Sequence, residues 1–101
     1  MGRVSVFGTI ECLEGRADEM AEVLAAMVEA AGEEPGVEIY SYHRGEGDQF
    51  WFFALMADPE SMQNHGRGEA MQAAMERFGP LMAAPPKMST ASPVAALGFD
   101  V

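Results

Sequence analysis

His65 is the side chain best suited to chemistry in this sequence. Histidine titrates near neutral pH, so a positioned imidazole can act as a general base or can orient a ligand. His65 follows Met62 by three residues in a segment that begins with Asp58-Pro59, an acid and a proline typical of a helix start. We expect His65 to point at a sheet or into a cleft beside it. The competing interpretation is a histidine that caps the helix or packs, held by a hydrogen bond.

Aromatic residues form the second candidate group. Tyr40 and Tyr42 alternate along one expected strand, and the block 50–53 (Phe-Trp-Phe-Phe) lies in the next. With Phe50 and Phe52, the tyrosines would form a flat wall of a pocket for an apolar or aromatic small molecule. A tyrosine hydroxyl would orient that molecule by a hydrogen bond. The same residues are typical of a core and of a subunit interface, and the sequence leaves both interpretations open.

Glu38 is the unusual acid of this region, since strand alternation places it on the face of Tyr40 and Tyr42. If that face is buried, we expect the carboxylate to be paired, with Arg44 as one partner, or to have a raised pKa. If the face is open, Glu38 is an ordinary solvated charge. Both alternatives remain open at this point.

Metal-binding and nucleophilic motifs are absent. The chain has one cysteine, Cys12, and two histidines, which excludes an intrachain disulfide, a cysteine-based cluster and a three-histidine zinc site. It also has no glycine-rich phosphate loop. We expect no metal, and we expect Cys12 to be a packing or surface residue because acidic neighbours disfavour a reactive thiolate.

The composition of the chain disfavours some classes of binding partner. The formal charge is −10, with 16 acidic against 6 basic residues, which disfavours nucleic acid and anionic membranes as partners. The length of 101 residues predicts one domain over residues 1–101. No apolar run is long enough to span a bilayer and no signal peptide is evident, so the expected location is cytoplasmic.

The order of local signals predicts a fold. Two amphipathic helices, the second interrupted at Gly66-Arg67-Gly68, separate strands expected at Val4–Ile10, Val37–Arg44, Gln49–Met56 and Val94–Phe99. This β-α-β-β-α-β order is the ferredoxin-like split βαβ arrangement, an α+β fold with an antiparallel sheet and helices on one face. Both faces of the strands are apolar, but the helices can cover only one face of the sheet. We therefore expect a homodimer that covers the other face.

Several segments in this order match one known family. They are residues 14–20 with the acidic start of the first helix, 34–40 with Glu-Pro-Gly and Tyr40, 50–53, 58–62, and His65 at the place of the family's helix histidine. Over about residues 3–99 the chain resembles the antibiotic biosynthesis monooxygenase family of the dimeric α+β barrel superfamily. The resemblance implies a homodimer with sheets packed face to face and a pocket between each sheet and its helices.

The resemblance also implies an activity. Members include monooxygenases that need no cofactor and act on electron-rich anthrones and quinols, with His65 here as the base. Tyr40, Tyr42 or Asn64 would then donate hydrogen bonds to the substrate oxygen. Ala54 and Met56 stand where the family often has Glu and Trp, and Glu38 would supply the missing carboxylate.

Two other functions fit the same sequence. One is a non-redox isomerase that uses His65 and Glu38 as acid and base. The other is a non-catalytic dimeric domain that binds a small molecule, which the replaced Glu and Trp favour.

Overall fold

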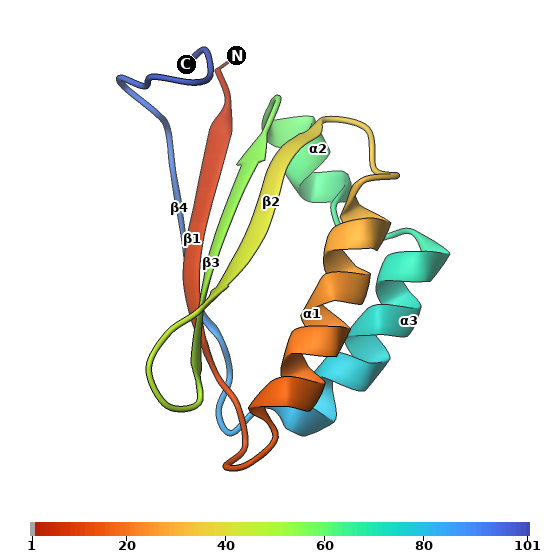
Figure 1. The fold of residues 1–101 in the computed structure, drawn as a ribbon. Coiled ribbons are helices and arrows are strands. Elements are labelled where there is room, and N and C mark those ends of the chain that lie inside the picture. Colours follow the sequence, from red (N-terminus) through yellow and green to blue (C-terminus); the bar gives the residue numbers. More distant parts are fainter. Residues whose placement is uncertain (1) are drawn as a thin grey trace.

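The computed structural model describes residues 2–101 and has an α+β architecture (Figure 1). In chain order the elements are β1 (Val4–Glu11), α1 (Ala17–Ala31), β2 (Val37–Arg44), β3 (Gln49–Met56), α2 (Pro59–Asn64), α3 (Glu69–Phe78), the 3-10 turn η1 (Gly79–Leu81) and β4 (Lys87–Ala91). The strands form one antiparallel sheet in the order β2-β3-β1-β4. Both α1 and α3 lie on the same side of that sheet. The ferredoxin-like prediction is confirmed.

The central strands β1 and β3 separate the core from an open face. They pair in register, with Val6 opposite Ala54 and Phe7 opposite Phe53. Side chains alternate between the faces of a strand, so Val6, Phe52 and Ala54 are buried against the helices. Phe7 and Trp51 point the other way and are 48% and 51% exposed. The rings of Phe7 and Phe53 lie 5.2 Å apart on that uncovered face.

Helix α1 buries the stripe that its spacing predicts. Met20, Val23, Leu24 and Met27 recur at helical intervals, and all are buried against the sheet and α3. Val28 follows Leu24 by four residues but lies at the edge of this stripe and is 38% exposed. Acidic residues fill the first turn, where the helix dipole favours negative charge. Because α1 is packed against the sheet and α3, it fixes where the following turn begins.

The second helical segment is divided as the sequence predicts. Asp58 caps α2 by accepting a hydrogen bond from the Ser61 N–H at 2.8 Å, which lowers the pKa of its carboxyl group. The chain leaves the helix at His65, and Gly66 has φ +89°, a conformation that favours glycine. Helix α3 then begins at Glu69. The break places His65 at a helix end and not inside a helix.

The expected final strand was placed wrongly. Val94–Phe99 forms no strand, and Val94 and Leu97 are fully exposed, at 92% and 102%. The strand is Lys87–Ala91, which pairs with β1 and completes the chain's own sheet. It lies between Pro85-Pro86 and Pro93, which donate no backbone hydrogen bonds and so bound the strand. The apolar side chains of 94–99 misled because apolar character alone does not form a strand: the edge of β1 pairs with Lys87–Ala91 instead.

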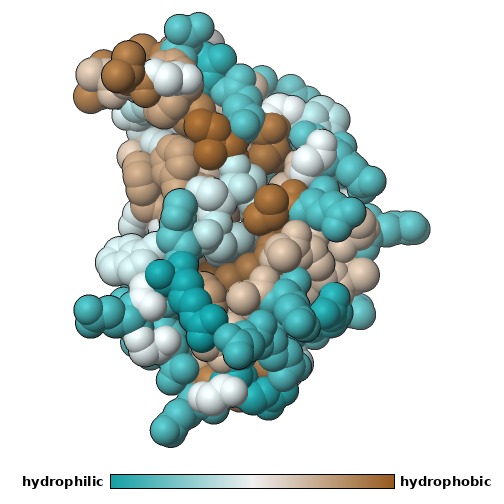
Figure 2. Space-filling view, viewed as in Figure 1, coloured by the Kyte–Doolittle hydropathy of each residue, from teal (hydrophilic) through white to brown (hydrophobic). Residues whose placement is uncertain are grey.

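Figure 2 shows hydrophobic side chains at the end of the sheet where both chain ends lie and also through the middle of the face, with hydrophilic side chains mainly around the periphery. Val94 and Leu97 belong to the C-terminal segment at that end. Within residues 2–101, no helix is long and apolar enough to cross a membrane.

Candidate functional site

A cavity of about 380 Å³ lies between the sheet and the helices α2 and α3. Its walls are mostly apolar, and the following residues supply them: Val6, Met27, Phe52, Met62, Met71, Met75, Phe78, Pro86 and Met88. Tyr40, Tyr42, His65 and Thr90 are the polar side chains among its lining residues. The lining contains no Asp, Glu, Lys or Arg. Such a site suits an uncharged, largely apolar small molecule held by a few polar groups.

The two tyrosines form a hydrogen-bonded pair in this wall. Their hydroxyl oxygens are 3.0 Å apart, and both rings pack on Phe52, with centroids 5.0 Å away for Tyr40 and 4.8 Å for Tyr42. Burial raises the pKa of both phenols above the ordinary tyrosine value. Both groups therefore remain protonated at neutral pH, so one hydroxyl of the pair is free to donate to a ligand oxygen.

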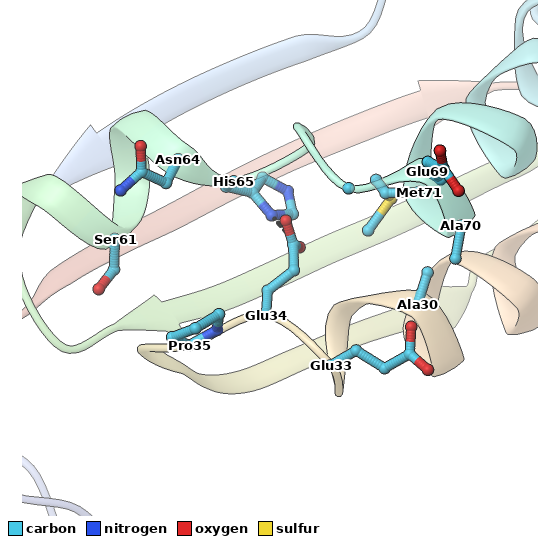
Figure 3. A pocket seen from close by; sticks show the side chains of 11 residues that line it. Ala30, Glu33, Glu34, Pro35, Ser61, Asn64, His65, Glu69, Ala70 and Met71 are labelled. Atoms are coloured by element: carbon cyan, nitrogen blue, oxygen red, sulfur yellow. Dashed lines mark hydrogen bonds and ion pairs between the residues drawn. The ribbon is translucent and has the colours of Figure 1, made fainter.

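His65 is held against the cavity by a carboxylate from another element. Its Nδ1 lies 2.8 Å from Oε1 of Glu34, and Oε2 of the same carboxylate accepts the Gly66 N–H at 2.7 Å. The imidazole ring also lies 5.2 Å from the Tyr40 ring. Figure 3 shows the ring edge with Nδ1 facing Glu34, while the other nitrogen, Nε2, points away. Within residues 2–101, no protein group is hydrogen-bonded to Nε2.

A second hollow of about 300 Å³ opens on the other side of His65. Glu34, Pro35, Ser61 and Asn64 are among its lining residues (Figure 3). His65 lines both spaces, whereas Glu34 lines the hollow and not the cavity. The imidazole thus lies between a cavity without acidic side chains and a hollow whose lining includes Glu33, Glu34 and Glu69.

The turn 33–36 sets the position of Glu34. The Glu34 N–H donates to the Ala31 carbonyl at 3.0 Å, which ties the residue to the end of α1. Gly36 has φ +84° and packs directly on Ser61 of α2, and its carbonyl accepts the Ala57 N–H at 2.7 Å. A side chain at residue 36 would collide with Ser61. The glycine therefore allows the close contact that brings Glu34 to His65.

The structure brings together part of the expected site. His65, Tyr40, Tyr42 and Phe52 all line the cavity. Phe50 does not: it is buried in the main core and contacts α1, with the Arg44 guanidinium 6.0 Å from its ring centroid.

Asn64 also does not line the cavity. It lines the second hollow, and its side chain points away from the Glu34–His65 pair in Figure 3. The residue lies at the end of α2, one position before the chain turns toward the cavity at His65. Neither Phe50 nor Asn64 therefore contacts a molecule in the cavity.

Glu38 lies apart from the cavity as well. The register between β2 and β3 shifts between Val37 and Ile39, so strict alternation fails at Glu38. Its carboxylate pairs with Arg3, with Oε2 3.1 Å from the guanidinium, and the side chain is 34% exposed. The expected partner Arg44 instead binds Asp18 at 2.8 Å. Glu38 is thus a half-exposed ion-pair residue at a bulge and not a wall of the cavity.

Glu34 is the site residue that sequence reasoning missed. It comes from a turn 31 positions before His65, and no local periodicity links the two. The available signal was the Glu34-Pro35-Gly36 segment itself, an acid placed where a glycine with positive φ turns the chain back toward the sheet. An acid at such a turn lies beside whatever element packs on the glycine.

Metal ligands are not assembled around this site. Among residues 2–101, no group of three or more His, Cys, Asp or Glu side chains is placed to hold a metal ion. Cys12 is buried in the core, and that burial, followed by the charge of Asp48, raises the pKa of its thiol. The thiol is therefore a packing group, as expected, although Asp48 and not the sequence neighbours supplies the charge.

Comparison with known proteins places this geometry in a family. The family model of the antibiotic biosynthesis monooxygenases matches residues 3–77. A protein named "putative antibiotic biosynthesis monooxygenase" from Chloroflexus aurantiacus is 24% identical, with a TM-score of 0.85 over 98% of this chain and 100% of that chain. Another of the same name from Caulobacter crescentus is 28% identical, with a TM-score of 0.80 over 93% and 92%.

A third structure, "NE2512 protein of unknown function" from Nitrosomonas europaea, is 24% identical, with a TM-score of 0.84 over 100% of this chain and 98% of that chain. No curated protein matches the sequence of this chain. The family match covers most of the chain, and the structural likeness extends over nearly all of it. The chain belongs to the antibiotic biosynthesis monooxygenase family.

Proposed function

We propose that this protein is a cofactor-independent monooxygenase of an electron-rich aromatic small molecule, of quinol or anthrone type. The observation that carries the proposal is the placement of His65, whose Nδ1 is held by Glu34 while the residue lines an apolar cavity. Nε2 is then the ring nitrogen that is left to act on a ligand. A base within an uncharged cavity is what an acidic C–H or O–H substrate requires.

The proposed reaction uses oxygen as the only co-substrate. Nε2 of His65 accepts a proton from an acidic CH₂ or phenolic group, and the resulting anion gives one electron to O₂. The substrate radical and superoxide combine to a peroxide anion, which takes the proton back from Nε2 of His65. The resulting hydroperoxide loses water and leaves a carbonyl. The net change is SH₂ + O₂ → S=O + H₂O, so the substrate supplies the electrons.

The tyrosine pair has the complementary role. The anion carries its charge on an oxygen conjugated with the reacting carbon, and neutral hydroxyl donors stabilise such charge in a low-dielectric site. Tyr40 and Tyr42 share the cavity wall with His65, and burial favours their neutral form. An aromatic substrate would pack between the Phe52 side of the sheet and the methionines of α2 and α3.

Oxygen uptake with a panel of quinols and anthrones tests the proposal, with chelator present and rates corrected for autoxidation. We expect His65→Ala to lower the enzyme-dependent rate by roughly 10²–10⁴-fold, the usual contribution of a general base. His43→Ala is the histidine control, because His43 bonds Ser41 away from the cavity. His43 pairs with Trp51 on the helix-free face, so light scattering must show that this variant keeps the wild-type oligomeric state. Equal rates in wild type and His65→Ala would remove His65 from the chemistry.

A non-redox proton transfer is the second candidate, since the acid–base groups contain nothing specific to oxygen. The family's strand residues Glu and Trp are replaced by Ala54 and Met56, and both side chains are fully buried in the core. Turnover that continues without oxygen would indicate an isomerase. Ligand binding without turnover in air would indicate a binding domain.

We also propose a homodimer that buries the helix-free face of the sheet. Phe7 and Trp51 are half exposed on that face and Phe53 packs beside Phe7. Exposed aromatic side chains on one face are typical of an interface, and a stable dimer buries roughly 1,600 Å² in total.

A further inference from the structure

We propose that Glu34 is the positioning residue that fixes the tautomer of His65, so that Nε2 faces the cavity without a proton. This inference deepens the proposed function and rests on it for its catalytic meaning. The tautomer itself is a property of the ligand-free protein, so it can be measured whether or not a substrate is known.

The hydrogen-bond pattern supports one tautomer. A carboxylate only accepts hydrogen bonds, and Oε1 of Glu34 lies 2.8 Å from Nδ1 of His65. Nδ1 must therefore carry the proton. A neutral imidazole has one N–H, so Nε2 has a free lone pair. That nitrogen is the one that Glu34 does not occupy.

The carboxylate has little freedom to turn. Its second oxygen accepts the Gly66 N–H at 2.7 Å, so both oxygens of Glu34 are engaged by neighbouring residues of the α2–α3 link. The Glu34 and His65 side chains are only 12% and 20% exposed. A solvent-exposed pair would be mobile and nearly neutral in energy, whereas this bidentate arrangement defines the ring orientation.

The pair is assembled from two elements that are 31 residues apart in the sequence. Glu34 belongs to the turn after α1, and His65 ends α2. The contact of Gly36 with Ser61 docks that turn against α2, close to both residues. The orientation of the base is thus set by tertiary packing and is present before a substrate enters the cavity.

The charge balance of the proton transfer agrees with this role. When the substrate C–H or O–H bond breaks, an N–H bond forms at Nε2 and the imidazole becomes a cation. The proton on Nδ1 stays in place, and the Glu34 carboxylate stabilises the new positive charge across 2.8 Å. Glu34 itself neither contacts the substrate nor takes the proton, because it does not line the cavity.

Glu34→Gln is the informative variant. Gly66 N–H needs an acceptor, so the amide oxygen faces Gly66 and the NH₂ group faces Nδ1. An NH₂ donor makes Nδ1 an acceptor and moves the imidazole proton to Nε2. The opposite amide orientation would place two donors against each other at Gly66. The variant keeps the side-chain shape and reverses the tautomer.

Nitrogen-15 NMR of histidine-labelled protein measures the tautomer directly, without ligand. His43 provides the second histidine signal and an internal reference. We expect an Nδ1–H signal for His65 in wild type and an Nε2–H signal in Glu34→Gln. Glu33→Gln removes the same charge one residue earlier, from an exposed side chain of the same hollow, and should leave the tautomer unchanged.

Steady-state oxygen uptake supplies the catalytic readout. We expect Glu34→Gln to lower kcat by about 10²-fold or more with KM unchanged, because the base is lost and the cavity wall is kept. A merely structural role would lower thermal stability and leave the tautomer as in wild type.

An Nε2–H signal in wild type overturns the proposal, and so does an unchanged tautomer in Glu34→Gln. The wild-type spectrum decides the first point even if the variant does not fold. If the tautomers are as expected and no substrate is turned over, Glu34 still positions His65, and the oxygenase proposal alone fails.

Discussion

Replacing Gly36 by alanine tests how the site is held together. Gly36 has φ +84°, and a Cβ atom added there would lie 1.8 Å from Ser61 Oγ and 2.6 Å from Ser61 Cβ. No real contact is that short, so either the Ser61 side chain rotates or α2 moves away from the turn. The second conflict involves Cβ of Ser61, which side-chain rotation does not relieve.

The cost has two parts. An L-residue at positive φ costs about 1–3 kcal/mol in backbone strain. Rotation of Ser61 also breaks the bond from its Oγ to Asp58 Oδ1 at 2.9 Å, which is worth about 0.5–1.5 kcal/mol. Together they give about 1.5–4.5 kcal/mol, equivalent to a loss of about 7–22 °C in Tm for a chain of this size. The variant should still fold, because domains have about 5–15 kcal/mol of stability.

Gly15→Ala is the matched control for thermal and urea unfolding. Gly15 has nearly the same conformation, φ +78°, but nothing lies within 4 Å of its added Cβ. It should show the backbone cost alone, without the Ser61 conflict. Gly36→Ala should also change the His65 nitrogen-15 signals, since α2 carries that residue. Equal loss of stability in the two variants, with unchanged His65 signals, would refute the argument that this contact positions the base.

Two further predictions concern the tyrosine pair and the open sheet face. Burial raises the pKa of Tyr40 and Tyr42, so their stabilisation is complete below about pH 10 and decreases as the pH rises above it, where only the unfolded chain ionises. Urea unfolding at increasing alkaline pH should show this loss, and the double phenylalanine variant should show less of it. Trp51→Glu should convert a dimer to a monomer in light scattering, whereas Val94→Glu, outside the sheet, should not. A wild-type monomer at micromolar concentration would contradict the dimer proposal.

Local signals in the sequence predicted most of the fold. The acidic start and methionine stripe of α1, the Asp58 cap of α2 and the glycine-rich break after His65 are interactions between near neighbours. The last strand was missed because its five residues are all exposed in the structure and carry little apolar signal. Its position depends on pairing with β1, more than 70 residues away, which no window of the sequence records.

Site residues on the sheet were predictable only where strand alternation holds. Tyr40, Tyr42 and Phe52 face the cavity as their alternation requires. Glu38 was misplaced because a bulge interrupts alternation just before Tyr40, and Arg3 captures its carboxylate. Residues that meet only through tertiary packing, such as Glu34 and His65, are not linked by any periodic pattern in the sequence.

The contrast between the protein surface and the cavity bears on the chemistry. The chain carries a net charge of −10, yet none of those charges lines the cavity. An anionic substrate would therefore meet repulsion outside and no cation inside, which favours entry of the neutral, protonated form. The proton must then be removed after binding, by a base that is already oriented. His65 is the one titratable base among the lining residues, and the tyrosines remain donors because burial keeps them neutral. The absence of charge from the cavity thus makes the orientation of a single imidazole the decisive element of the proposed reaction.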